Sequence, residues 1–213
     1  MVITKLQATK RGNRINVYID KQFAITVSIR LLSEEALFQG KRLSKNEAEK
    51  IRKKAILDLC YDRVVDLLSR RPRSEYEIRT YIVRKLKTKK DKNVLIDDLI
   101  ESLKKKQLID DKKFAKWWIR SRIAFKPRGS YLVTKELLVK GVDKDTIASA
   151  LEDASFRKSE FKLALRAGEK KVRQMKEITD IKNIRRFIAY LQRKGFSYDI
   201  AKRALKNLQK KNT

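Results

Sequence analysis

The chain has 213 residues, the length of one or two ordinary domains, with 38% charged residues, six glycines, two prolines and no histidine. Without histidine, nucleophiles of the Ser-His or Cys-His type and histidine zinc sites are excluded, and the scarcity of glycine and proline favours long helices. The 55 basic against 26 acidic side chains give a formal net charge of +29. A polyanion such as nucleic acid is therefore the first partner to consider, with a merely solvated basic surface as the alternative.

The first 30 residues differ from the rest, because β-branched and aromatic residues are concentrated there in three short runs. The polar breaks between the runs predict a three-stranded antiparallel meander. A short helix ending at Gly40 is expected to cover one face of the strands. The predicted strands are 3–6, 14–19 and 23–27, and the apolar residues assigned to the covering helix are Ile29, Leu31, Leu32, Leu37 and Phe38.

A long helical pattern follows from Ser44, which forms a candidate capping box with Glu47, to about Arg70. We expect this helix to bend or break near Ala55. The single cysteine, Cys60, lies on the apolar stripe, which predicts a buried, reduced thiol in a cytoplasmic protein. No apolar run approaches the roughly 18 residues that span a bilayer, so no membrane segment is predicted.

A second capping-box candidate, Ser74 with Glu77, begins a helix whose sequence recurs further along the chain. Residues match at an offset of 55, and a third, blurred copy follows at an offset of 54. The matching pairs include Pro72 with Pro127, Arg73 with Arg128, Tyr76 with Tyr131, Lys85 with Lys140, Lys140 with Lys194, and Gly141 with Gly195. Such a period is typical of stacked helical modules.

The predicted fold is therefore mainly α, with tandem three-helix repeats in an elongated curved array after a small N-terminal β-meander. Asp110 and Asp143 are expected N-caps, and Gly141 and Gly195 are expected to leave their helices in left-handed geometry. A basic loop at 87–93 precedes a helix from about Val94 to Lys105. The predicted domains are 1–43, 44–108, 109–154 and 155–213.

Two features with catalytic or binding potential have plainer explanations. The pairs Asp97-Asp98 and Asp110-Asp111 are candidates for a nuclease Mg²⁺ site, but adjacent helical residues point about 100° apart and Asp110 reads better as a cap. Trp117 and Trp118 are candidates for stacking on unpaired bases. Because Phe114 and Phe125 share their helical spacing, core packing is the favoured interpretation for at least one of the two tryptophans.

The basic residues give the candidate binding sites. Arg71 and Arg73, then Lys126 and Arg128, precede equivalent helices, where cations do not complement the helix dipole; an anionic partner and simple solvation explain them about equally well. Residues 156–213 carry a formal charge of +13, and we expect this part to bind DNA. The remaining candidates for contact with DNA or a partner are Lys140, Arg157, Lys158, Arg166, Lys170, Lys171, Arg173, Arg185, Arg186, Arg193 and Lys194.

Several ordered segments resemble the RecX family, bacterial modulators of the RecA recombinase. The segments are 71–78, with its Ser-Glu-Tyr-Glu-Ile run; 109–115, with Ile-Asp-Asp and Phe-Ala; 129–142, with Glu-Leu and Lys-Gly-Val; and Gly195-Phe196 with Asp199-Ile200. Together they cover roughly residues 56–208. Gln107, where a glycine would be more usual, and the large positive charge depart from the family pattern.

The resemblance implies tandem three-helix repeats and a non-enzymatic regulator of recombination, DNA repair and the SOS response. It implies binding in the groove of the RecA filament on DNA, with inhibition of ATP hydrolysis and strand exchange. The expected partners are the RecA filament and single- and double-stranded DNA, with no cofactor, metal or membrane, and the expected state is a monomer in the cytoplasm. The alternative is a general basic nucleic-acid-binding protein without a recombinase partner.

Overall fold

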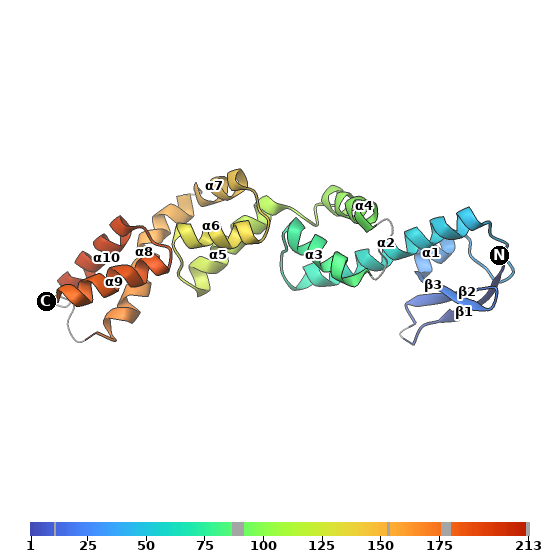
Figure 1. Cartoon of the computed structure of the whole chain (residues 1–213), viewed down its shortest axis with the longest axis horizontal. Helices are drawn as coiled ribbons and strands as arrows, with labels where there is room; N and C mark the ends of the chain where they lie inside the picture. The colour runs from blue at the N-terminus through green and yellow to red at the C-terminus, as the bar shows by residue number, and fades with distance from the viewer. Residues whose placement is uncertain (11, 87–91, 153, 176–179, 212–213) are drawn as a thin grey trace. The chain divides into compact units, whose positions relative to one another are not determined.

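The computed structural model describes residues 1–10, 12–86, 92–152, 154–175 and 180–211, and the side chains of 92–94, 154–155, 157–158 and 211 lie outside the description. Within these residues the chain forms three strands and ten helices in two compact units (Figure 1). Unit 1 comprises 1–71 and 78–108, and unit 2 comprises 72–77 and 109–213. The predicted mainly helical fold with a small antiparallel sheet is confirmed. No described helix has the length and apolar character needed to cross a membrane.

The sheet of unit 1 is a meander in which both strand pairings are antiparallel. Its strands are β1 (Ile3–Ala8), β2 (Arg14–Ile19) and β3 (Gln22–Ser28). Asp20 and Lys21 connect β2 to β3 with φ angles of 48° and 67°. Positive φ at both central residues is the requirement of a type I′ hairpin, whose twist matches that of the strands it joins. The three predicted strands are thus confirmed.

The covering helix is shorter than predicted. α1 (Ile29–Glu34) ends six residues before Gly40, where Ala36 takes a φ of 44° and Lys41 Nζ donates to the carbonyl oxygen of Glu35 at 2.6 Å. Placing Phe38 in the covering layer was wrong, because its side chain is 58% exposed. The chain instead turns back after α1. The buried core between the sheet and the helices consists of Ile3, Val17, Val27, Leu31, Leu37, Leu43, Ile51 and Ala55.

α2 (Lys45–Arg70) is one uninterrupted helix of 26 residues, so the expected break near Ala55 was wrong. Its N-terminus carries the predicted capping box between Ser44 and Glu47. No glycine or proline occurs along it, and Ala55, 1% exposed, packs into the core with the residue type of highest helix propensity. Cys60 is buried as predicted, and burial raises the pKa of its thiol.

A cluster of two buried and two exposed charged residues joins β2 to α2 in unit 1. Arg14 and Asp58 are each 8% exposed, and an Arg14 nitrogen lies 3.3 Å from the Asp58 carboxylate. Arg30 donates to the same carboxylate at 2.9 Å, and Arg14 also pairs with Asp62. Burial raises the pKa of Asp58, but hydrogen bonds from Arg30 and Ser28 and the charge of Arg14 outweigh it, so the pKa lies below its usual value. We call these four charged residues the Asp58 cluster.

The helices α3 (Glu75–Lys85) and α4 (Lys92–Lys105) agree with the prediction. The apolar stripe of α4 is buried, and Asp97 pairs with Arg79 at 2.5 Å. The basic loop predicted at 87–93 falls, for residues 87–91, outside the described part of the chain. The buried apolar residues of these helices are Ile78, Ile82, Leu95, Ile96, Leu99, Ile100 and Leu103.

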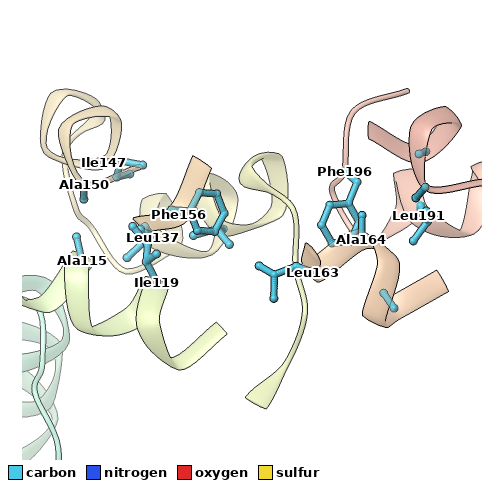
Figure 2. Close-up of a cluster of buried hydrophobic side chains, with 14 of the residues drawn as sticks. Ala115, Ile119, Leu137, Ile147, Ala150, Phe156, Leu163, Ala164, Leu191 and Phe196 are labelled. Atoms are coloured by element: carbon cyan, nitrogen blue, oxygen red, sulfur yellow. The ribbon is translucent and has the colours of Figure 1, made fainter. Parts of the chain in front are cut away.

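Unit 2 holds two sets of three helices around one continuous core (Figure 2). The helices are α5 (Asp111–Phe125), α6 (Ser130–Val139), α7 (Lys144–Glu152), α8 (Ala154–Val172), α9 (Ile181–Arg193) and α10 (Tyr198–Lys211). Asp110 and Asp143 accept hydrogen bonds from backbone amides three residues on, at 3.0 and 2.8 Å, as predicted. Figure 2 shows Phe156 of α8 beside Leu137 of α6, so α8 continues the core into the last set.

Candidate nucleic-acid interface

The segment that begins α3 contacts the end of α6. Ser74 Oγ donates to the carbonyl oxygen of Lys140 at 2.6 Å and accepts from the amide of Glu77 at 3.2 Å. Gly141 has a φ of +75°, and a Cβ there would lie 2.4 Å from Cβ of Tyr76. The predicted left-handed C-cap glycine is therefore also the point of closest approach between the two segments. We call this contact the first junction.

The same contact recurs one repeat later, between the start of α6 and the end of α9. The amide of Gly129 donates to the carbonyl oxygen of Lys194 at 2.9 Å, and the amide of Tyr131 donates to Gly195 at 3.3 Å. A Cβ on Gly129 would come within 2.1 Å of the Gly195 oxygen. Gly195, with a φ of +87°, has no room for a side chain either. This second junction explains the sequence repeat as a repeated docking contact.

The two junctions differ in one charge. At the first, Lys140 Nζ lies 2.7 Å from the Glu77 carboxylate. At the second, the residue at the offset of 55 from Glu77 is Leu132, and no carboxylate among the described side chains pairs with Lys194. Lys194 Nζ instead lies over the ring of Tyr190, 5.1 Å from its centroid. Burial lowers the pKa of Lys194, and the positive charges of Arg128 and Lys170 lower it further.

Lys194 belongs to a basic hollow of about 690 Å³ beside the second junction. The hollow lies where the loop between α5 and α6 meets the C-terminal half of α8 and the end of α9. Arg166 helps to hold it, because its guanidinium donates to the last carbonyls of α5, on Ile123 and Ala124, at 2.9 and 3.2 Å. We call it the Phe125 hollow; its charged and aromatic lining residues are Phe125, Lys126, Arg128, Arg166, Glu169, Lys170, Arg173, Tyr190 and Lys194.

A second basic hollow, of about 770 Å³, lies next to the first. It is formed by the end of α8 and one face of α9, and we call it the α9 hollow. Lys171 of this hollow lies 5.7 Å from the centroid of the Tyr190 ring, which Lys194 approaches from the Phe125 hollow. Tyr190 thus lies near one lysine of each hollow. The lining residues of the α9 hollow are Lys171, Gln174, Met175, Asn183, Arg185, Arg186, Ala189 and Arg193.

Ten of the fifteen predicted candidates line these two hollows. Arg71 is the C-cap of α2 in unit 1, whereas Arg73 lies in unit 2 before α3. Lys140 is held at the first junction by Glu77. The side chains of Arg157 and Lys158 lie outside the described residues. The structure therefore groups most of the predicted basic residues, although the sequence presented them as scattered.

The aromatic residue at the basic surface is one that the sequence analysis assigned to the core. Phe125 is 82% exposed, because the core ends about one turn before the end of α5. The helical spacing from Phe114 predicts which face of the helix carries Phe125. It does not predict whether another element of the protein packs over that face. The position directly before Lys126-Pro127 was the available signal, since a proline ends the helix and exposes its last turn.

Core packing was predicted for at least one tryptophan, and both Trp117 and Trp118 are partly buried against the core of unit 2. Trp118 Nε1 donates to the Glu136 carboxylate at 2.8 Å, and Arg122 pairs with the same carboxylate at 2.6 Å. The Arg122 guanidinium and Lys140 Nζ also lie 4.1 and 4.4 Å from the Trp118 ring. The ring is thus already in contact with two cations, which argues against its use as a stacking platform.

Three of the four acidic residues considered for metal binding have structural partners. Asp110 caps α5, Asp111 accepts a hydrogen bond from the amide of Glu75 at 2.9 Å, and Asp97 pairs with Arg79. Within the described part of the chain, no group of three or more possible ligand residues could hold a metal ion.

Comparison with known protein families gives matches along the chain to four models of one family. These are the regulatory protein RecX N-terminal domain at residues 1–44 and the first, second and third RecX three-helix domains at residues 60–86, 110–151 and 158–205. The last two models fall on the two helix sets of unit 2.

Curated relatives match over almost the whole chain. The regulatory protein RecX of Bacillus velezensis is 29% identical over 211 residues, which cover 99% of this chain and 78% of the relative. The regulatory protein RecX of Clostridioides difficile is 26% identical over 97% of this chain and 95% of the relative. That of Lactobacillus johnsonii is 33% identical over 150 residues, with 70% and 54% covered.

Solved structures agree with this assignment. A crystal structure of regulatory protein RecX superposes with a TM-score of 0.69 at 25% identity, covering 94% of this chain and 97% of that one. RecX from Lactobacillus salivarius has the same fold, with a TM-score of 0.63 at 23% identity over 72% of this chain and 97% of that one. With four successive family domains and relatives that match nearly end to end, the chain belongs to the RecX family of regulatory proteins.

Proposed function

We propose that this RecX-family chain regulates homologous recombination by binding in the groove of the RecA filament on DNA, where it inhibits ATP hydrolysis and strand exchange. The observation that carries the proposal is the pair of basic hollows in unit 2, which place ten basic side chains against one carboxylate. A filament on DNA presents a long, repeating array of negative charge, and adjacent basic hollows match such a polyanion.

The contact with DNA belongs to the same proposal. Arg185, Arg186 and Arg193 of the α9 hollow are exposed on one helix, which suits contact with successive phosphates rather than recognition of bases. Each phosphate neutralised should add about −0.9 on duplex DNA, or about −0.7 on a single strand, to the slope of log affinity against log salt. An affinity that does not change with salt would rule out this contact.

The second candidate function is that of a general basic DNA coat, since the hollows would also favour DNA without RecA. Titration of RecA's DNA-dependent ATPase separates the two. A groove-binding regulator restrains several recombinase subunits, so inhibition should be complete well before bare DNA would be covered. A coat must instead inhibit in proportion to the DNA covered.

Charge-reversal variants sharpen this test. We expect glutamate at Arg71, Arg73, Lys126 and Arg128 to weaken ATPase inhibition more than binding to bare duplex DNA, because these residues recur with the repeat as a periodic partner would require. Lys202→Glu, on an exposed position of α10 outside both hollows, is the matched control. If inhibition appears only at DNA saturation, and the reversals lower both effects equally, the coat is the correct function.

A further inference from the structure

The Phe125 hollow combines features that a purely electrostatic surface does not need. An aromatic ring that is 82% exposed stands beside six basic side chains, and the lining includes only one carboxylate, Glu169. Phosphate neutralisation alone requires no exposed aromatic side chain. An unpaired nucleotide offers both partners at once, an anionic phosphate for the cations and a flat π-face for the ring. In duplex DNA that face is covered by the neighbouring bases.

The comparison of the two junctions shows where the anion would sit. At the first junction the Glu77 carboxylate occupies the position next to Lys140 Nζ, 2.7 Å away. At the second junction the chain supplies Leu132 instead, and Arg128 and Lys170 add positive charge around Lys194. The first junction thus has a carboxylate of the chain itself beside its lysine. At the second junction the matching position has no carboxylate, so an anion from another molecule can bind there.

The number of cations favours a polyanion over a single acidic side chain. At the first junction one lysine pairs with one carboxylate, which shows that a single basic side chain is enough to bind a single acidic residue. The Phe125 hollow is lined by six basic side chains, of which Arg128 also lies 3.8 Å from the Glu136 carboxylate and Arg166 binds backbone carbonyls, and the α9 hollow is lined by four more. A strand with regularly spaced phosphates can reach both hollows, whereas one glutamate cannot.

We propose that the Phe125 hollow is a binding site for single-stranded nucleic acid, in which Lys194, Arg128 and Lys170 hold a phosphate and Phe125 stacks on a neighbouring base. This site rests on the DNA contact proposed above, and it adds a preference for unpaired strands. It does not depend on RecA, so it can be tested without the recombinase, and its failure would leave binding in the filament groove unaffected.

The first test measures fluorescence anisotropy of the full chain with a labelled oligo-dT and with a duplex of the same length. Phe125→Ala should weaken single-strand binding roughly tenfold and change duplex binding by less than about twofold, because only unpaired bases can stack. Phe125→Trp should retain single-strand affinity. Val139→Ala is the matched control, since Val139 is a 79% exposed apolar residue on α6 outside the hollow. Equal effects of the two alanine variants on single-strand binding would overturn the proposal.

The second test supplies the missing carboxylate. Leu132→Glu should give Lys194 an internal partner like Glu77 and weaken single-strand binding roughly tenfold, whereas the uncharged Leu132→Gln should have a much smaller effect. Lys194→Gln should make the salt slope for oligo-dT less negative by about 0.7, and Lys202→Gln should leave the slope unchanged. Lys202 is a close control, because it also lies over a tyrosine ring, that of Tyr198 at 5.9 Å. Equal binding by both Leu132 variants would argue against the anion position.

A competition experiment distinguishes nucleic acid from an acidic protein segment. Unlabelled oligo-dT should displace the labelled strand at far lower concentration than an oligoglutamate peptide with the same number of charges. Circular dichroism and urea unfolding of each variant exclude a loss of fold as the cause. If oligoglutamate competes as well as oligo-dT, and Phe125→Ala has no effect, the hollow takes protein carboxylates and the nucleic-acid site is wrong.

Discussion

The two junctions of unit 2 have similar docking contacts but different electrostatics. In each, the segment that precedes a helix docks on a lysine-glycine pair that ends another helix. The first junction is neutral within the chain, because Glu77 meets Lys140. At the second, Lys194 stands among other cations. In both junctions a hydrogen bond to the lysine carbonyl and a closely packed glycine hold the segments together, by the Ser74 side chain at the first and by the Gly129 amide at the second, so the junction charges are free to differ.

The largest expected effect comes from removing the close approach at the second junction. A methyl group at Gly129 would lie 2.1 Å from the carbonyl oxygen of Gly195. The atoms that it would meet, on Gly195 and Phe196, belong to the backbone and cannot move aside without a large cost. We expect Gly129→Ala to lower the free energy of unfolding of unit 2 by about 3 kcal/mol. Urea unfolding followed by tryptophan fluorescence measures it, because both tryptophans of the sequence lie in unit 2. Ser149→Ala, an exposed position of α7, is the control, and a loss no larger than that of the control would contradict the close contact.

The first junction should respond less to the same change. A side chain at Gly141 would meet Tyr76, and because Tyr76 is 54% exposed its ring can move aside. We therefore expect Gly141→Ala to lower the free energy of unfolding by about 2 kcal/mol. Gly141→Asn separates strain from crowding, since asparagine tolerates positive φ but has a Cβ. If Asn destabilises as much as Ala, crowding against Tyr76 dominates. A nearly neutral Asn variant would show that φ is the only requirement.

The ion pair at the first junction should contribute a smaller amount. Glu77 and Lys140 side chains are 16% and 20% exposed, so screening by water is incomplete. A double-mutant cycle with Glu77→Gln and Lys140→Gln should give a coupling energy of about 1 kcal/mol. The same cycle between Leu132→Gln and Lys194→Gln has no pair to remove and should give a value near zero. Equal coupling at both junctions would mean that their electrostatics do not differ.

The Asp58 cluster extends the comparison to unit 1, where the chain again supplies its own counter-charges. Because the pKa of Asp58 is lower in the folded protein than in the unfolded chain, its contribution is present above the unfolded value. That contribution is lost as the pH falls through the lower, folded value. We expect the free energy of unfolding of unit 1 to fall by about 1 kcal/mol over this acidic range. The fall should be smaller in the Asp58→Asn and Arg30→Gln variants, because each removes one partner of the interaction.

Labelling of Cys60 measures this loss selectively. The thiol is 5% exposed and is the only cysteine of the sequence, so it reacts when unit 1 opens. The chain is held at each acidic pH and the fraction opened is read by pulse labelling after return to neutral pH. A pH dependence that is identical in wild type and Asp58→Asn would assign the effect to other carboxylates.

Much of the fold could be predicted from local signals. The capping residues Ser44, Asp110 and Asp143 and the glycines Gly141 and Gly195 act through their nearest neighbours in the chain, and each was predicted in its correct role. The errors arose where contacts between residues far apart in the sequence determine where a helix ends. α1 ends early because the chain turns back at Ala36, and Lys41 then caps the freed carbonyls.

The candidate site shows the same division. Charge counts identified the basic residues of 156–213, but only the second junction brings Lys126 and Arg128 of one repeat to Lys194 of the next. Phe125 was assigned to the core because its period is correct, and the extent of the core cannot be read from a period. The domain borders at 43, 108 and 154, and the roles of Arg157 and Lys158, stay predictions.

The glycine junction also bears on how such a chain can change in length. The repeat formed by α5, α6 and α7 carries both halves of the contact: the Lys126–Gly129 segment that docks forward, and the Lys140-Gly141 end that receives the preceding segment. A head-to-tail contact of this kind can be repeated, because each repeat uses one half of the contact and presents the other half to its neighbour. Duplication of one such repeat in the gene would therefore create a longer protein with every new interface already formed, and relatives could gain or lose whole repeats without redesign of a core.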